Sequence, residues 1–127
     1  MRWKLFSLLL ACSGVTIIFG ALVLRFGNLV PTYLTYLTFI AAAAVFIDSF
    51  FVLRRSKFAL LTGVLLGVIA IAVSSNPAHF TALLQFGSSL AVSLADITMV
   101  LGFYLFPGIY ITLYIMSVIG RRKKAAK

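Results

Sequence analysis

Long apolar segments, separated by short stretches of polar residues, make up most of this chain. Residues 5–24, 30–53 and 58–74 are three such segments, and they contain almost only aliphatic, aromatic and small side chains. Each is close to the roughly 20 residues that an α-helix needs to cross the hydrocarbon core of a bilayer, which is about 30 Å thick. Charged or polar residues follow each segment. The pattern therefore predicts three transmembrane helices in the first part of the chain.

The remaining apolar stretch is too long for a single straight crossing. No lysine or arginine lies within residues 78–119, and Asp96 is the only acid there. As one helix this stretch of about 42 residues would be roughly 63 Å long, about twice the thickness of the hydrocarbon core. In one interpretation, residues 77–87 lie along the membrane interface and residues 88–119 cross once, bent or broken at Pro107. In the other, the stretch crosses twice and turns near residues 102–108.

The distribution of positive charge decides between these interpretations. Loops rich in lysine and arginine face the cytoplasm in membrane proteins. Four spans place ten of the eleven lysine and arginine residues on one side and leave only Arg25 on the other, whereas five spans divide them five against six. We therefore predict an all-α bundle of four transmembrane helices, with an interfacial helix before the last span and both termini in the cytoplasm. Residues 120–127 then form a basic cytoplasmic tail.

The composition agrees with this class and excludes several others. Apolar residues make up 63% of the 127 residues and charged residues only 10%, whereas a soluble domain carries about 25% charged residues. A soluble globule and a disordered tail are thereby excluded, and a single cysteine excludes a disulfide scaffold. The net charge of +9 does not indicate a nucleic-acid partner, because nucleic-acid binders spread their cations over a water-exposed face. We expect a multi-pass protein of the cell membrane, specifically of a prokaryotic plasma membrane.

The N-terminus needs a separate explanation. A short basic segment followed by an apolar run resembles the first part of a secretory signal peptide. The apolar run, however, continues to Leu24 and reaches the length of a full span. We therefore expect this segment to be kept as the first transmembrane helix.

Few side chains are available for catalysis or metal binding. The chain contains no glutamate, one histidine (His79), one cysteine (Cys12) and two aspartates, Asp48 and Asp96. A structural zinc site takes four cysteine or histidine ligands, and only two exist here. Acid–base catalysis by a carboxyl pair would require the two aspartates to meet, but the predicted spans place them toward opposite faces of the membrane. We expect no enzymatic activity, no cofactor and no metal.

Small residues recur at helical spacing on the predicted helices. Such residues let two helix backbones approach closely, which is how transmembrane helices associate. On the third helix this face consists of Gly63, Gly67, Ala70 and Ser74, and on the first helix the corresponding face contains Gly14. In one interpretation these faces only hold the four helices of one chain together. In the other, the glycine face of the third helix docks another subunit.

Asp48 is expected near the cytoplasmic end of the second helix. Arg55 follows seven residues later, which places it on nearly the same helix face, where it can neutralise the carboxylate at the interface. The two aspartates together allow a different interpretation, in which they mark the two ends of a proton or cation path.

Asp96 belongs to a polar stripe on the last predicted helix. The stripe has spacings of four, four and three residues, and it consists of Gln85, Ser89, Ser93 and Asp96. We expect it to face the bundle interior, a water-filled cavity or a partner, because charged groups facing lipid are costly. Arg25, at the outer end of the first helix, is the only basic residue on that side, and we predict that it pairs with Asp96.

These features favour a non-catalytic function. We expect a small accessory or structural subunit of a membrane complex, or a self-assembling oligomer, whose partners are the bilayer and other membrane subunits or a second copy of the chain. The basic cluster next to the last span is expected to contact anionic lipid headgroups, at roughly 1 kcal/mol per cation; it consists of Arg121, Arg122, Lys123 and Lys124. The alternative is a small transporter or channel whose path follows the stripe around Asp96.

Overall fold

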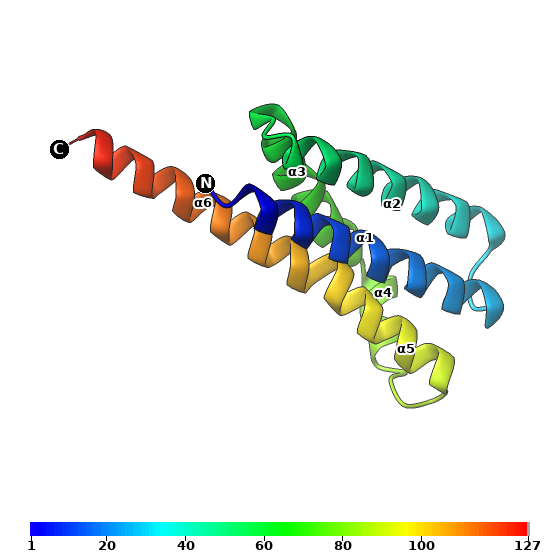
Figure 1. Cartoon of the computed structure of the whole chain (residues 1–127). Coiled ribbons are helices and arrows are strands. Elements are labelled where there is room, and N and C mark those ends of the chain that lie inside the picture. Colours follow the sequence, from blue (N-terminus) through cyan, green and yellow to red (C-terminus); the bar gives the residue numbers. More distant parts are fainter. Residues whose placement is uncertain (127) are drawn as a thin grey trace.

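The structure, a computed structural model, describes residues 1–126, and every regular element in this range is helical. The elements in chain order are α1 (Trp3–Phe26), α2 (Thr32–Leu53), α3 (Lys57–Ser74), α4 (Pro77–Leu83), α5 (Leu90–Met99), the π-helix η1 (Val100–Leu105) and α6 (Phe106–Ala125). The last three follow one another without interruption and form a single helix of 36 residues (Figure 1).

The prediction of four long apolar helices is confirmed. α1, α2, α3 and the continuous α5–η1–α6 helix are each long and apolar enough to cross a membrane. Their outward surfaces carry large apolar side chains, for example Ile40 and Leu65, which are 66% and 59% exposed. A surface of this kind is unfavourable in water and suits the hydrocarbon of a bilayer. By length and composition, the fold is that of a multi-pass membrane protein.

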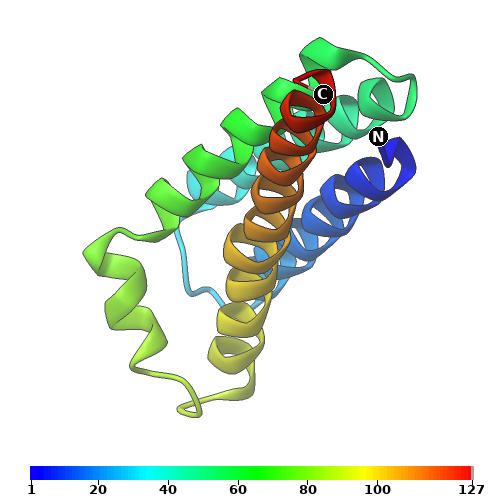
Figure 2. The ribbon, with the colours of Figure 1, turned by 90° about the vertical axis from the view of Figure 1, so that its left-hand side faces the viewer.

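Each of the four long helices packs mainly against two others, and α1 makes the most extensive contacts. It packs against α2 on one side and against the α5–η1–α6 helix on the other, while α3 contacts α2 and α6 (Figures 1 and 2). Both termini and the α2–α3 turn lie at one end of the bundle, and the α1–α2 turn and the α4–α5 turn lie toward the other end. The cations of the termini and of the α2–α3 turn therefore gather at the same end.

The best-packed part of the bundle is the half that contains the termini. The buried side chains there come from all four long helices and form one cluster of Phe6, Leu10, Val45, Val52, Ala59, Leu60 and Tyr110. Tyr110 and Phe6 are each only 1% exposed, and their rings meet edge to face with centroids 5.0 Å apart. In the other half of the bundle α1 and α5 leave an open groove between them.

The long helix passes Pro107 without breaking, in contrast to the bend or break that the sequence suggests. A proline lacks a backbone N–H and clashes with the carbonyl of the preceding turn of an α-helix. Here the preceding turns are wider: the N–H of Phe106 donates to the carbonyl of Leu101, five residues back. This π-helical register accommodates the proline inside a continuous helix.

The boundaries of the last two predicted segments shift. α4 covers only Pro77–Leu83, and the long helix begins at Leu90 and ends at Ala125, rather than covering residues 88–119. The helix starts where it does because the hydroxyl of Ser89 accepts a hydrogen bond from the N–H of Val92, at 3.2 Å, and so caps the first turn. At its other end the basic segment extends the helix instead of forming a separate tail.

Candidate functional site

A buried polar junction joins three helices in the well-packed half of the bundle. Asp48 of α2 is only 6% exposed, and Gly63 of α3 faces it. A Cβ atom at Gly63 would lie 3.0 Å from the Asp48 Oδ2 and would overlap the hydroxyl of Tyr110 of α6. The aspartate and the tyrosine therefore reach the same space, and that space exists because residue 63 has no side chain.

Tyr110 is held at this junction by a hydrogen bond to the backbone. Its hydroxyl donates to the carbonyl of Leu60 at 3.0 Å, one turn before Gly63 on α3. A buried tyrosine hydroxyl needs a partner, and a helical carbonyl has a second lone pair to offer. The bond fixes α6 to α3 and leaves the lone pairs of the tyrosine oxygen available to accept a proton donor.

A second polar contact lies beside the junction and joins α1 to α2. Ser49 donates to the backbone carbonyl of Ser7 at 2.8 Å, and the hydroxyl of Ser7 lies 3.0 Å from the carbonyl of Ser49 and 2.9 Å from its hydroxyl. Both hydroxyl groups thus have their partners within this pair. They provide no donor for the neighbouring Asp48.

Asp48 and Asp96 each retain a buried oxygen without a partner. The Oδ2 atoms of both carboxyl groups are inaccessible to solvent and have no hydrogen-bond partner among the described residues. Arg55, the expected partner of Asp48, is exposed in the α2–α3 turn with a φ of 63°. Because α2 ends at Leu53, the helical spacing that would have aligned Arg55 with Asp48 does not extend that far.

The predicted pair of Arg25 and Asp96 is not formed in the described part of the chain. α1 and α5 contact each other through Gly20 and Thr98, which lie side by side. Arg25 lies five residues from Gly20, so its side chain leaves α1 about 140° around the helix axis from this contact. Asp96 lies two residues from Thr98, so its side chain leaves α5 about 160° around the helix axis from the same contact. Arg25 is exposed, whereas Asp96 is only 5% exposed.

The polar stripe around Asp96 is only partly a helix face, contrary to the prediction. Gln85 is exposed in the turn that precedes α5. Ser89 caps α5, and the hydroxyl of Ser93 accepts the N–H of Gly87 at 3.0 Å and donates to the carbonyl of Ser89 at 2.9 Å. The serines therefore stabilise the start of the helix, and Asp96 is the only member of the stripe that is buried.

The small residues pack the helices of one chain together. Gly63 faces Tyr110, and a Cβ atom at Gly67 would lie 3.2 Å from Ile111 and 3.3 Å from Pro107, both on α6. In the structure α6 therefore covers the glycine face of α3 at Gly63 and Gly67. The other members of the predicted set are also internal or partly so: Gly14 faces the ring of Phe46 on α2, Ser74 is buried, and Ala70 is half-buried.

One buried contact was missed at the sequence level. The hydroxyl of Ser13 on α1 donates to the carbonyl of Gly102 in η1 at 2.7 Å. In the π register the donor for this carbonyl would be residue 107, which is a proline and has no N–H. The α-helical donor, Phe106, is already bonded to Leu101. The proline indicated that one backbone carbonyl in the preceding turn would lack its helical donor. The sequence did not show which carbonyl this is, or which helix would supply another donor.

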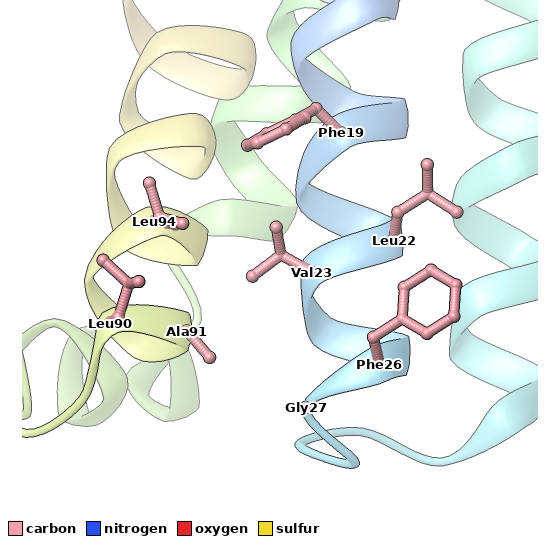
Figure 3. A pocket seen from close by; sticks show the side chains of 8 residues that line it. All are labelled: Phe19, Leu22, Val23, Phe26, Gly27, Leu90, Ala91 and Leu94. Atoms are coloured by element: carbon pink, nitrogen blue, oxygen red, sulfur yellow. The ribbon is translucent and has the colours of Figure 1, made fainter.

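An apolar groove separates α1 and α5 in the less densely packed half of the bundle. It has a volume of about 580 Å³. Its lining consists only of apolar side chains and one glycine, namely Phe19, Leu22, Val23, Phe26, Gly27, Leu90, Ala91 and Leu94 (Figure 3). Val23 and Leu94 border the space from the two helices, and Ala91 points toward Gly27 at its end. No hydrogen-bonding side chain lines the groove.

The basic residues of the last helix lie at its C-terminal end. They are exposed at the end of α6, which projects beyond the other helices (Figure 1). In residues 1–126, no three side chains of histidine, cysteine, aspartate or glutamate come together. Comparison with known protein families, with curated proteins and with solved structures finds no match to this chain.

Proposed function

We propose that this protein acts without catalysing a reaction, as a small accessory or structural subunit of a membrane complex or as a self-assembling oligomer of the cell membrane. The apolar groove between α1 and α5 supports this proposal best. Inside a bilayer, helices associate through close packing, because hydrocarbon gives no hydrophobic drive between them. An open concave surface between two helices is where a further helix can gain such contacts.

The occupant that we propose is an apolar transmembrane helix of another subunit. The groove has no polar side chain that could hold a hydrophilic ligand. Gly27 and Ala91 close the groove at one end, where a Cβ atom at Gly27 would lie 3.4 Å from that of Ala91. In the well-packed half, the hydroxyl groups of Ser7, Ser49 and Tyr110 are engaged inside the chain. The groove is therefore the surface at which the chain would join other membrane proteins.

A matched pair of substitutions tests this assignment. Val23→Phe places a ring in the groove, whereas Val68→Phe makes the same change on the exposed face of α3, where Val68 is 50% exposed. We expect the parent protein and Val68→Phe to migrate as the same complex in nanodiscs made directly from native membranes. Val23→Phe should release the monomer. A monomeric parent would overturn the proposal.

A lipid is the competing occupant, and the same experiment distinguishes it. If the parent is a monomer whose bound lipid, measured by mass spectrometry, is lost on Val23→Phe, the groove binds an acyl chain and the subunit proposal fails. If native mass measurement gives a complex of several chains with the groove free of lipid, the proposal stands. The partner can then be a second copy or a different protein, and the measured mass separates the two.

The second candidate function is proton or cation transport, and it depends on Asp96. The observation in its favour is that Asp96 is buried with an unpartnered Oδ2 atom. Intramembrane carboxyl groups of this kind mark ion or proton pathways in many membrane proteins. Transport requires that purified protein in liposomes carries protons or cations and that Asp96→Asn abolishes this flux. Absence of flux in the parent, or equal flux in the variant, would eliminate this candidate.

A further inference from the structure

The buried carboxyl group of Asp48 requires a compensating positive charge or a proton. A carboxylate that is removed from water without a partner is strongly unfavourable, and in proteins such a group is paired, coordinated or neutralised. Asp48 is 94% buried (it is 6% exposed), and its Oδ2 atom has no partner in residues 1–126. The junction described above therefore needs a positively charged ligand that residues 1–126 do not provide.

In the part of the chain that the structure describes, no cation pairs with Asp48. From α3 the junction receives the backbone of Leu60 and Gly63, and from α6 it receives Tyr110. Tyr114, also on α6, packs against the same core. The basic residues nearest in sequence lie in or next to the α2–α3 turn and are exposed: Arg54, Arg55 and Lys57.

The serine pair does not provide a donor either. Ser7 on α1 approaches this region, but its hydroxyl is engaged with Ser49. All four long helices thus contribute to the surroundings of Asp48, and none of them supplies a charge or a free proton donor to the carboxyl group.

We propose that the junction of Asp48, Tyr110 and the space in front of Gly63 is a proton-binding site. With a proton on Oδ2, Asp48 becomes a hydrogen-bond donor, and the oxygen of Tyr110 can accept because its own proton is donated to Leu60. Oδ2 has no hydrogen-bond partner in the structure, so this bond forms when the protonated side chain turns toward the tyrosine oxygen, and α2, α6 and α3 are then linked by successive donors. Without the proton, the carboxylate would face the lone pairs of the tyrosine oxygen.

A proton suits this site better than a metal ion. Hard metal ions take about six or more oxygen ligands, whereas the junction offers the carboxyl group, one hydroxyl and one carbonyl. A cavity of about 30 Å³ borders Gly63 and Tyr110, but Asp48 is not part of its mainly apolar lining, so the cavity adds no ligand set for a metal ion at the carboxyl group. The proposal concerns the interior of the bundle and does not depend on what occupies the groove between α1 and α5.

The small number of acids makes a direct measurement possible. The chain has only two acidic side chains, so that in the Asp96→Asn variant Asp48 is the only side-chain carboxyl group. Infrared spectra of this variant in lipid nanodiscs should contain the carbonyl band of a protonated carboxylic acid at neutral pH. The band should be missing from the Asp48→Asn, Asp96→Asn double variant, which carries the same terminal carboxylate and serves as the reference for subtraction.

Two further measurements test whether Tyr110 accepts the acid proton and whether the site binds a proton rather than Na⁺. Tyr110→Phe removes the acceptor of the acid proton and should shift the band, whereas Tyr104→Phe, at a tyrosine bonded to Ser75 instead, should leave it in place. Addition of Na⁺ should not change the band. Loss of the band on addition of Na⁺ would identify a metal-ion site and overturn the proton proposal.

The outcome does not depend on the Asp48→Asn variant folding. If that variant cannot be purified, labelling of aspartate with ¹³C in the Asp96→Asn protein assigns the band, because only Asp48 then carries the label. An unshifted spectrum on labelling, or the absence of a protonated band at neutral pH, would mean that Asp48 is ionised in the folded bundle. The proposal would then be wrong.

Discussion

The hydroxyl of Ser13 on α1 donates a hydrogen bond to the backbone carbonyl of Gly102, 89 residues away in the chain, at 2.7 Å. This carbonyl is the one that loses its helical donor because Pro107 follows a π-helical turn. One helix thus supplies the donor that the proline removes from another. The contact explains how a proline can lie within a continuous helix of 36 residues.

Removal of this hydroxyl should destabilise the bundle. Ser13→Ala leaves a buried carbonyl without a donor, which costs about 1–3 kcal/mol, and we expect a loss near the lower end because hydrogen bonds between membrane helices average only about 0.6 kcal/mol. Unfolding by SDS from mixed micelles measures the change. Ser88→Ala, at an exposed serine of the α4–α5 turn, should have no effect. Equal effects of the two substitutions would contradict the assignment.

The proline and the serine should be energetically coupled. Pro107→Ala restores an N–H at position 107 and provides a donor for the carbonyl of Gly102 inside the helix. Ser13→Ala should then cost clearly less in the Pro107→Ala background than in the parent. A double-mutant cycle in the same unfolding assay measures this difference, and it is not affected by the separate loss of packing between Pro107 and Gly67. An unchanged cost would show that the two residues act independently.

Gly63 should tolerate no side chain. Gly63→Ala forces a methyl group against the hydroxyl of Tyr110 and the carboxyl group of Asp48, and overpacking of this kind costs about 1–3 kcal/mol. Gly108→Ala is the matched control, because a Cβ atom there has nothing within 4 Å; it should be neutral or stabilising by up to about 1 kcal/mol. Tyr110→Phe should relieve part of the cost of Gly63→Ala. The same stability for both alanine variants would contradict the junction.

The orientation in the membrane can be tested with single cysteines in a Cys12→Ala background. Nine of the ten cations in residues 1–126 lie at or near the end of the bundle that holds the termini, and the positive-inside rule places that end in the cytoplasm. A membrane-impermeant maleimide should therefore label Asn28→Cys in intact cells and label Ala125→Cys only after the cells are permeabilised. The opposite pattern would place the termini outside.

The helix contacts show which parts of the bundle a single sequence can predict. The four spans follow from uninterrupted apolar length, and the importance of Gly63 and Gly67 follows from their spacing. Which helix fills the glycine face could not be predicted, because the same small residues serve a partner chain or a helix of the same chain equally well. The structure places Tyr110, Pro107 and Ile111 of α6 there.

The prediction for Asp96 failed for a geometric reason. Pairing with Arg25 required only that both residues lie toward the same end of the bundle, which the sequence indicates. It also required that both side chains point into the same interface, and this depends on the rotation of α1 and α5 about their axes. Contact through Gly20 and Thr98 turns both charged residues away from that interface.

The sequence by itself determined the membrane class, the four apolar helices and the scarcity of acidic and metal-binding groups, since these depend on composition and on the length of local segments. Only the tertiary structure decided how the helices are rotated and which groups meet. Burial of Asp48 beside Gly63 and Tyr110, and the donation from Ser13 to Gly102, arise between segments far apart in the chain. Local periodicity sets the face on which a residue lies, but the neighbour of that face is set by the packing of all four helices at once.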